Sequence, residues 1–366
     1  MDARLVPAGR HRPPRPSRPT RLVPAFAALL LAALLAACTS TGTASSSPTP
    51  SATALAVATA TAAPTATPAP TASLATSYPL TLTDDEGTSV TIPTEPTKIV
   101  SLTPAATETL FALGLGDRIV GKVEDFTPYP ADAAKVPDVA KFGSVDVEKI
   151  VGLGTQLVIA GGDNFNPPDS IAKLRQLGVP TLVVFAPDVK GALADISLIG
   201  KATGTPNEAA AIDQTIQSDF DQVGTATAGL PKPRVYYELD ATNGYFGPAP
   251  DYFGTEMIST AGGDPLTSGQ KGVYQIEPEK ILAFDPQVIL LGDAAYGVTP
   301  EQVKARSGWD AISAVRTGEV RPIDDVVVTR PGPRLGDGIR ALAQAIHPDV
   351  VLPSPAPSGS GDPYGQ

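Results

Sequence analysis

Few side chains in this sequence could carry out catalysis. The 366 residues contain two histidines and one cysteine. His11 lies in an N-terminal segment typical of an export signal, and His347 ends a predicted helix, where an imidazole interacts favourably with the helix dipole. One remaining histidine and the single Cys38 provide too few ligands or nucleophiles for a tetrahedral zinc site or for a serine or cysteine triad.

Motifs of nucleotide-dependent enzymes are also missing from the sequence. Gly114-Leu-Gly116 and Gly152-Leu-Gly154 each lack the third glycine of a dinucleotide-binding loop, and no Walker-type lysine loop occurs. Asp and Glu are plentiful, so a cell-surface hydrolase that uses a pair of carboxylates stays open as an alternative. We predict that the protein is not an enzyme and that it has neither a resident cofactor nor a metal site.

Aromatic side chains in predicted loops offer a different kind of chemistry. Proline and glycine neighbours place most of them outside regular elements. Such rings can grip a large, partly apolar ligand, although several of them could instead fill the ends of a sheet. They are Phe126, Tyr129, Phe142 and Phe165 in the first half of the chain and Tyr245, Phe246, Tyr252, Phe253 and Tyr274 in the second half.

The N-terminal segment predicts export and a lipid anchor. Six arginines precede the apolar run Leu22–Ala37, which is shorter than the about 20 residues that span a bilayer. Leu35-Ala36-Ala37-Cys38 is similar to a bacterial lipobox, which implies that a signal peptide at residues 1–37 is removed and that Cys38 is acylated. A plain signal peptide with an incidental cysteine is the alternative. The lipid on Cys38 would hold the protein at the outer face of the cell membrane.

The charge of the mature chain argues against nucleic acid as a partner. Without residues 1–37, which hold six arginines and one acid, 21 Lys and Arg stand against 37 Asp and Glu, a formal charge of −16. Nucleic-acid phosphates require a basic surface, whereas an acidic body does not adhere to an anionic membrane. We therefore expect a monomeric, soluble body whose stability depends on a hydrophobic core.

Two segments of low complexity flank the predicted globular part. Apart from Cys38, residues 38–77 are almost entirely Ser, Thr, Ala and Pro. Residues 352–366 are similarly poor in large apolar side chains. Such segments bury too little apolar surface to offset the entropy of ordering them. We predict a disordered tether at residues 38–77, a globular part at residues 78–351 and a disordered tail at residues 352–366.

Strand and helix patterns alternate in both halves of the globular part. Residues 78–188 begin with a hairpin around Asp85-Glu86-Gly87 and continue with short apolar strands between helices, and residues 231–351 repeat this alternation. A helical stretch at residues 189–230, interrupted only at Gly204-Thr205-Pro206, lies between them. The predicted fold is α/β: two Rossmann-like lobes with mostly parallel sheets, joined by one long connecting helix.

A gapless internal repeat supports two related lobes. The segment that starts at Asp146 aligns with the segment that starts at Glu277, an offset of 131 residues, and five positions hold the same residue. Both segments also follow the order of a helix and then a buried strand. The identical positions are Glu148 and Glu279, Lys149 and Lys280, Ile150 and Ile281, Gln156 and Gln287, and Gly161 and Gly292.

Several motifs resemble the substrate-binding proteins of ABC importers for cobalamin, ferric siderophores and haem. The resemblance covers about residues 78–350 and implies two lobes of a helical-backbone periplasmic-binding-protein fold, with the ligand in the cleft between them. It also implies an ABC permease and its ATPase as partners. The motifs are Lys98–Gly121, Tyr129-Pro130 with Lys135–Pro137, Val147–Leu153 and Arg330–Leu335.

The resemblance implies a role for two of the repeated glutamates. In the cobalamin-binding members one glutamate of each lobe docks on arginines of the permease, and Glu148 and Glu279 are the matching positions. Both are predicted in the first turn of a helix, after Asp146 or Glu277 as the cap. The alternative is that each glutamate complements its helix dipole, which typically contributes about 0.3–1 kcal/mol.

The resemblance also implies a ligand, cobalamin or a related corrinoid, held by aromatic side chains. Tyr129 matches a tyrosine of the cobalamin-binding members, Phe142 and Tyr274 lie at or near the positions of two tryptophans, and Tyr245 or Phe246 near a phenylalanine. The absence of both tryptophans leaves haem and ferric siderophores open.

Haem and ferric siderophores would use other side chains. Haem requires an axial ligand, for which Tyr129 or Tyr274 would have to serve. An anionic ferric catecholate would favour a basic cleft. Lys122, Lys141, Lys271, Arg330 and Arg334 could supply one, or the arginine of the Pro-Gly-Pro-Arg turn could instead cap the last helix.

Overall fold

The computed structural model describes residues 75–163 and 165–355. The predicted signal peptide at residues 1–37, Cys38 and nearly all of the tether and the tail lie outside these ranges, so those predictions stay untested. No helix within the described part of the chain is long and apolar enough to cross a membrane.

The N-terminal lobe is built on a six-stranded sheet with the order β6-β5-β4-β3-β7-β8. All neighbours pair in parallel except β5 and β6, which are antiparallel. The central strands are buried on both faces, as a parallel sheet between layers of helices requires. The strands are β3 (Ile99–Ser101), β4 (Ile119–Val123), β5 (Asp138–Lys141), β6 (Ser144–Val145), β7 (Leu157–Ala160) and β8 (Thr181–Val183).

Local signals in the sequence explain where the elements of this lobe begin. The Thr103 side chain accepts a hydrogen bond from the backbone of Ala106 at the start of α1, and Asp146 caps α2 through the backbone N–H of Lys149. The predicted hairpin is present as an antiparallel pair of strands. These elements are β1 (Leu80–Thr83), β2 (Ser89–Ile92), α1 (Pro104–Ala112), α2 (Val147–Gly152) and α3 (Pro168–Gln176).

The C-terminal lobe has a four-stranded parallel sheet with the order β11-β9-β13-β14 and a small antiparallel pair, β10 and β12. Its strands are β9 (Arg234–Glu238), β10 (Tyr245–Phe246), β11 (Asp264–Pro265), β12 (Gln275–Ile276), β13 (Val288–Leu291) and β14 (Val320–Pro322). Its helices are α6 (Phe253–Thr260), α7 (Pro278–Phe284), α8 (Pro300–Lys304), α9 (Ser313–Thr317), α10 (Asp325–Thr329) and α11 (Leu335–Ile346). Two lobes with mostly parallel sheets are therefore confirmed.

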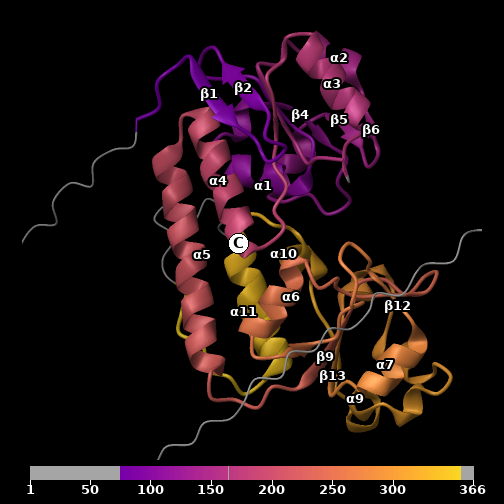
Figure 1. Ribbon diagram of the computed structural model, residues 1–366. Helices are drawn as coiled ribbons and strands as arrows, with labels where there is room; N and C mark the ends of the chain where they lie inside the picture. Colours follow the sequence, from indigo (N-terminus) through magenta and orange to yellow (C-terminus); the bar gives the residue numbers. More distant parts are fainter. Residues whose placement is uncertain (1–74, 164, 356–366) are drawn as a thin grey trace, which may run out of the picture. The chain divides into compact units, whose positions relative to one another are not determined.

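The predicted helical connection at residues 189–230 is present, and the predicted break at Gly204-Thr205-Pro206 divides it into two helices, of which one runs between the lobes. Helix α4 (Val189–Thr203) ends at Gly204, whose φ of 81° is left-handed, and Pro206 begins α5 (Pro206–Thr227). Helix α5 has 22 residues, about 33 Å of helix, and packs along both α4 and α11 (Figure 1). It therefore reaches from the N-terminal lobe to the C-terminal lobe, while α4 folds back beside it.

Apolar packing continues from one lobe into the other. The largest cluster of buried side chains includes residues of the first sheet, α4, α5, the second sheet and α11. Two smaller clusters fill the opposite faces of the two sheets. Because one continuous core joins the lobes through the connecting helices, a hinge motion would have to break packed contacts, and we expect the lobes to move little relative to each other.

The internal repeat folds as the same unit in both lobes. Helix α2 leads into β7, and α7 leads into β13. In each lobe the repeated glutamine reaches the first strand of its sheet: the Oε1 atom of Gln156 accepts from the backbone of Lys98 at 3.2 Å, and that of Gln287 from the backbone of Arg234 at 3.1 Å. The repeated glutamine therefore links the starts of two neighbouring strands by a hydrogen bond in both lobes.

Candidate ligand-binding cleft

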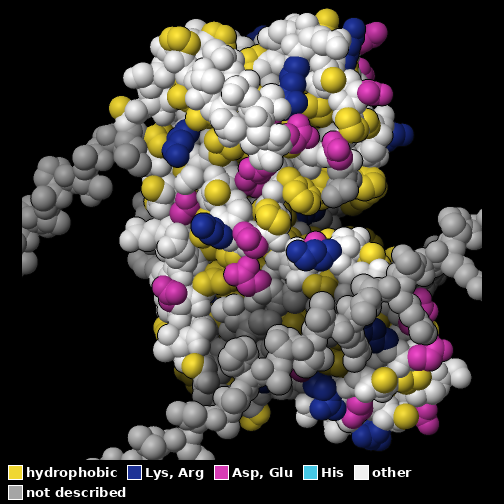
Figure 2. All heavy atoms as spheres, in the orientation of Figure 1, with side chains coloured by type: hydrophobic (Ala, Val, Ile, Leu, Met, Phe, Trp, Pro, Cys, Tyr) yellow, Lys and Arg dark blue, Asp and Glu magenta, His cyan; other side chains and the backbone are white. Residues whose placement is uncertain are grey.

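A cleft of about 940 Å³ lies between the lobes. One wall comes from the start of α1 and from loops that follow the carboxyl ends of β3, β7 and β8. This edge is where ligands bind in open parallel sheets. The opposite wall comes from the loops before α6 and β12, and α4 forms the floor. Figure 2 shows the hollow, with hydrophobic side chains gathered on its N-terminal-lobe side.

Aromatic rings from both lobes line the cleft. Phe142 is 77 % exposed and meets Phe165 edge to face, with 6.3 Å between the ring centroids. On the other wall, Tyr274 is 39 % exposed and lies edge to face with Tyr252 at 5.7 Å. Exposed aromatic faces on two opposite walls fit a large ligand with broad apolar surfaces.

The floor of the cleft carries one buried acid. Asp195 lies on α4 beside Ile196 and Ile199, which also line the cleft, and it is 6 % exposed. Burial, followed by the hydrogen bond to Asp85 and the charge of Asp85, raises the pKa of Asp195 to about 9. At neutral pH the floor is therefore apolar with an uncharged carboxyl group.

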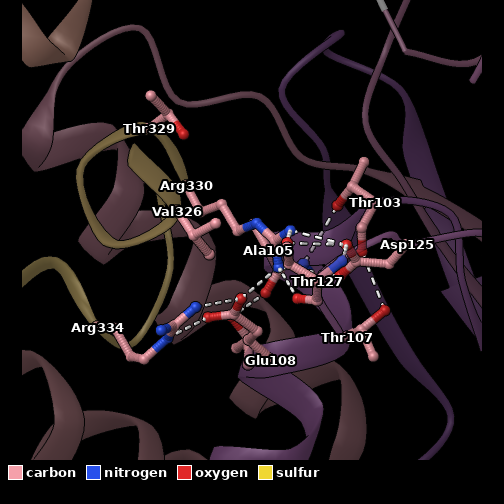
Figure 3. A network of polar contacts seen from close by, with 12 residues as sticks. Thr103, Ala105, Thr107, Glu108, Asp125, Thr127, Val326, Thr329, Arg330 and Arg334 are labelled. Atoms are coloured by element: carbon pink, nitrogen blue, oxygen red, sulfur yellow. Dashed lines mark hydrogen bonds and ion pairs between the residues drawn. The ribbon is translucent and has the colours of Figure 1, made fainter. Parts of the chain in front are cut away.

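Four ionised side chains join the lobes at the edge of the cleft (Figure 3). We call Glu108, Asp125, Arg330 and Arg334 the interlobe ion cluster. Arg330 donates to Glu108 at 2.7 Å and to both carboxylate oxygens of Asp125 at 2.8 and 2.9 Å. Arg334 donates to Glu108 through two nitrogens, each at 2.8 Å. The cluster has two positive and two negative charges and ties the last segment of the chain to the first lobe.

The structure places three of the six predicted ligand residues in the cleft lining: Phe142, Tyr274 and Arg330. The guanidinium of Arg330 is already paired, as described above. Tyr129 lies at the cluster instead, with the guanidinium carbon of Arg334 3.9 Å from the centre of its ring. Arg334 stands at the cap position of α11, but its side chain makes no cap hydrogen bond.

Tyr245 and Phe246 are absent from the cleft lining. Both belong to β10, whose pairing with β12 sets Tyr245 opposite Ile276. Tyr245 then packs on Trp309, with 5.1 Å between ring centroids, and on Arg306. Its place beside the C-terminal-lobe core follows from that strand pairing, and the geometry gives the predicted ligand contact no support.

The predicted basic cleft is only partly present. Lys122 is buried and paired with Asp138, while Lys141 is exposed outside the lining. Of the lysines considered for this role, only Lys271 lines the cleft. Most of the cations that the sequence offers for a basic cleft are therefore paired with acids or lie outside the cleft in the folded protein.

The two predicted docking glutamates lie outside the cleft. Glu148 is exposed in the first turn of α2, and Glu279 is exposed in the first turn of α7. Asp146 caps its helix as expected, whereas the Glu277 side chain makes no cap hydrogen bond. Both glutamates are thus free to meet a partner surface, and their docking role stays a prediction.

Several lining residues were not singled out as ligand residues from the sequence. Phe165, Tyr252 and Phe253 belong to the loop aromatics, and only the fold distinguishes them from Tyr245. The sequence does contain a signal that could have identified Asp195, because this acid lies among isoleucines that recur at helical spacing. Within residues 75–163 and 165–355, no three His, Cys, Asp or Glu side chains form a group that could hold a metal ion.

Comparisons with known proteins agree with this architecture. The periplasmic binding protein family matches residues 99–327. An uncharacterized ABC transporter substrate-binding lipoprotein of Bacillus subtilis, YvrC, is 33 % identical over 75 % of this chain and 87 % of its own length. A vitamin B12-binding protein of Vibrio cholerae is 30 % identical over 67 % of this chain and 87 % of its own length.

A solved structure extends the comparison. The haem-binding protein RhuT from Roseiflexus sp. RS-1 superposes with a TM-score of 0.61 and 25 % identity, covering 69 % of this chain and 98 % of that protein. The family match spans more than half of the sequence and includes most of the loops that form the cleft. The chain is a member of the periplasmic binding protein family.

Proposed function

We propose that the protein captures cobalamin or a related corrinoid outside the cell and delivers it, chemically unchanged, to an ABC permease. The observation that carries this proposal is the cleft between the lobes, about 940 Å³ in volume and faced by aromatic rings on opposite walls. A corrinoid is a large ring with apolar faces and a polar edge, so it matches the shape and the chemistry of this cleft. The vitamin B12-binding relative supports the same ligand.

The proposal includes an anchor and a partner. Acylation of Cys38 would hold the protein at the outer face of the membrane, and the substrate-binding lipoprotein of Bacillus subtilis supports this arrangement. A tether at residues 38–77 would allow the globular part to reach the permease. No step of this function requires a bond in the ligand to break, which is why we propose a binding protein and not an enzyme.

Haem is the second candidate ligand, favoured by the likeness to RhuT. Tyr274 is the lining tyrosine that was predicted as an axial ligand. However, burial and then the charge of Asp251 raise the pKa of Tyr274, which disfavours the phenolate that would bind ferric iron. This electrostatic setting makes a corrinoid the better supported ligand.

Ligand titration tests the proposal. We expect saturable binding of cobalamin by the purified chain, followed by calorimetry or by quenching of Trp309 fluorescence. Trp309 is buried outside the cleft lining, so quenching would reflect energy transfer to the coloured ligand. The visible spectrum of protein purified from its own host would identify a ligand that copurifies. Saturable binding of haem or a ferric chelate without binding of any corrinoid would refute the proposal, and so would turnover of the ligand.

A further inference from the structure

The interlobe ion cluster removes from the cleft the positive charge that its arginines would otherwise provide. Arg330 lines the cleft, yet its two terminal nitrogens donate to Glu108, to Asp125 and to the side chain of Thr127, the last at 2.8 Å. Arg334 is held by Glu108 through two donors. Both arginines therefore direct at least two of their N–H groups at acidic partners within the protein.

The acids of the cluster are more deeply buried than its bases. The side chains of Glu108 and Asp125 are 2 % and 8 % exposed, and those of Arg330 and Arg334 are both 15 % exposed. A ligand anion that approached Arg330 would lie close to two carboxylates in a setting where solvent screens charges poorly. It would meet the two arginines only together with the two carboxylates that already neutralise them.

The other ionisable groups of the lining add no net positive charge. Lys271 and Asp251 line the same wall and have opposite signs. Asp195, on the floor, is held in its uncharged form. Together, the lining and the interlobe ion cluster therefore balance to about zero, on a chain whose formal charge is −11.

We propose that Glu108 and Asp125 set the charge selectivity of the cleft, so that it accepts large chelates without net negative charge and rejects polyanionic ones. This inference rests on the proposed function, the capture of a metal chelate in the cleft, and names the chemical class of that chelate. Corrinoids with amide side chains belong to the accepted class. Haem, with its carboxylates, and ferric tricatecholates, with three negative charges, belong to the rejected class.

A pair of corrinoids that differ only in charge tests the inference. Cobalamin and the tricarboxylate obtained by hydrolysing three of its peripheral amides have nearly the same shape. We expect the wild-type chain to bind the tricarboxylate about 100-fold more weakly than cobalamin, as measured by calorimetry. A ratio below about threefold would overturn the inference, whatever the fate of the variants below.

The double variant Glu108→Gln/Asp125→Asn isolates the cause. It keeps the shapes of both side chains and leaves two arginines without charged partners, so the affinity ratio should shrink to less than about tenfold through tighter binding of the tricarboxylate. The control Asp169→Asn/Glu301→Gln changes two exposed acids and alters the net charge equally. Its ratio should match that of the wild type.

The outcomes separate this inference from the proposed function. An unchanged ratio in a double variant that still binds cobalamin would mean that the cluster only fastens the lobes, and the inference would be wrong. Should the double variant not fold, the single Asp125→Asn variant carries the same comparison. If the protein binds no corrinoid but prefers an uncharged ferric trihydroxamate to a ferric tricatecholate, the proposed ligand is wrong and the charge selectivity stands.

Discussion

At the scale of single residues, the environment of each aromatic side chain decides what it can do. Phe142 and Tyr245 both belong to the loop aromatics, yet Phe142 is exposed at the cleft and Tyr245 packs on Trp309. An exposed ring has apolar area left to bury against a ligand, whereas a packed ring has already buried it.

The exposed rings of the cleft should contribute directly to affinity. We expect Phe142→Ala and Tyr274→Ala each to weaken corrinoid binding about 10-fold or more, because each removes an aromatic contact worth about 1–2 kcal/mol. Phe126→Ala is the matched control, since Phe126 is 88 % exposed and does not line the cleft. Equal affinity of all three variants would show that the ligand does not use these walls.

Asp195 gives the protein a characteristic dependence of stability on pH. Its pKa is raised from 3.8 to about 9, so between these values the folded chain keeps a proton that the unfolded chain releases. The contribution to stability is full below about pH 4 and is lost as the pH rises towards 9. In Asp195→Asn the amide should mimic the protonated acid and raise the unfolding free energy at pH 7 by at least about 1 kcal/mol.

Urea unfolding at pH 5, 7 and 9 measures this effect for the wild type and the variant. The gain from Asp195→Asn should grow as the pH rises, because the variant no longer has the group that titrates. Asp169→Asn, at an exposed acid of α3, should leave the pH dependence unchanged. A gain that shrinks with rising pH would contradict the predicted direction of the pKa shift.

At the scale of elements, the internal repeat is a packing requirement rather than a shared active site. Ile150 and Ile281 are fully buried. A Cβ atom on Gly161 would lie 2.2 Å from the Thr103 side chain, and one on Gly292 would lie 2.8 Å from the ring of Tyr237. The repeated isoleucine and glycine are therefore residues that the helix-to-strand unit needs in order to pack against its own sheet.

The repeated glutamines should stabilise both lobes. Gln156→Ala and Gln287→Ala remove the acceptors of backbone donors at the starts of β3 and β9, so each should lower the unfolding free energy by about 0.5–1.5 kcal/mol. Gln176→Ala, at an exposed position at the end of α3, should change it by less than about 0.5 kcal/mol. Urea unfolding of the three variants makes the comparison, and equal values for all three would contradict the fastening role.

At the scale of the whole molecule, a continuous core and the interlobe ion cluster together fix the cleft. Helix α5 packs on α6 and α11 of the C-terminal lobe and on α4, which in turn contacts α1 and β1 of the N-terminal lobe. Glu108 of α1 meets Arg330 across 222 residues of sequence. A cleft held in this way can present its walls before the ligand arrives, which lowers the entropy cost of binding.

Recognition by the permease should depend on a different surface from ligand capture. In Glu148→Ala/Glu279→Ala we expect unchanged corrinoid affinity and loss of uptake, because both glutamates lie outside the cleft. Asp169→Ala/Glu301→Ala removes acids from the first turns of two other helices and should leave uptake intact. Uptake at the wild-type rate in the first variant would mean that these glutamates serve only their helices.

The sequence by itself determined the order and most boundaries of the elements. The predicted hairpin around Asp85-Glu86-Gly87 and the predicted break at Gly204-Thr205-Pro206 both agree with the structure. Such elements depend on local patterns, namely apolar periodicity, caps and glycine or proline stops, and these can be read from neighbouring residues. The motifs that resemble a known family likewise predicted the two-lobe fold.

Only the tertiary structure decided which side chains face the ligand and which charges remain free. Tyr252 and Tyr245 look alike in the sequence, but Tyr252, at the start of α6, lines the cleft, whereas the pairing of β10 with β12 places Tyr245 against the core. Arg330 appeared available until the fold brought Glu108 and Asp125 to it from more than 200 positions away. The charge of the cleft is a sum over distant segments, and local patterns carry no information on distances between such segments.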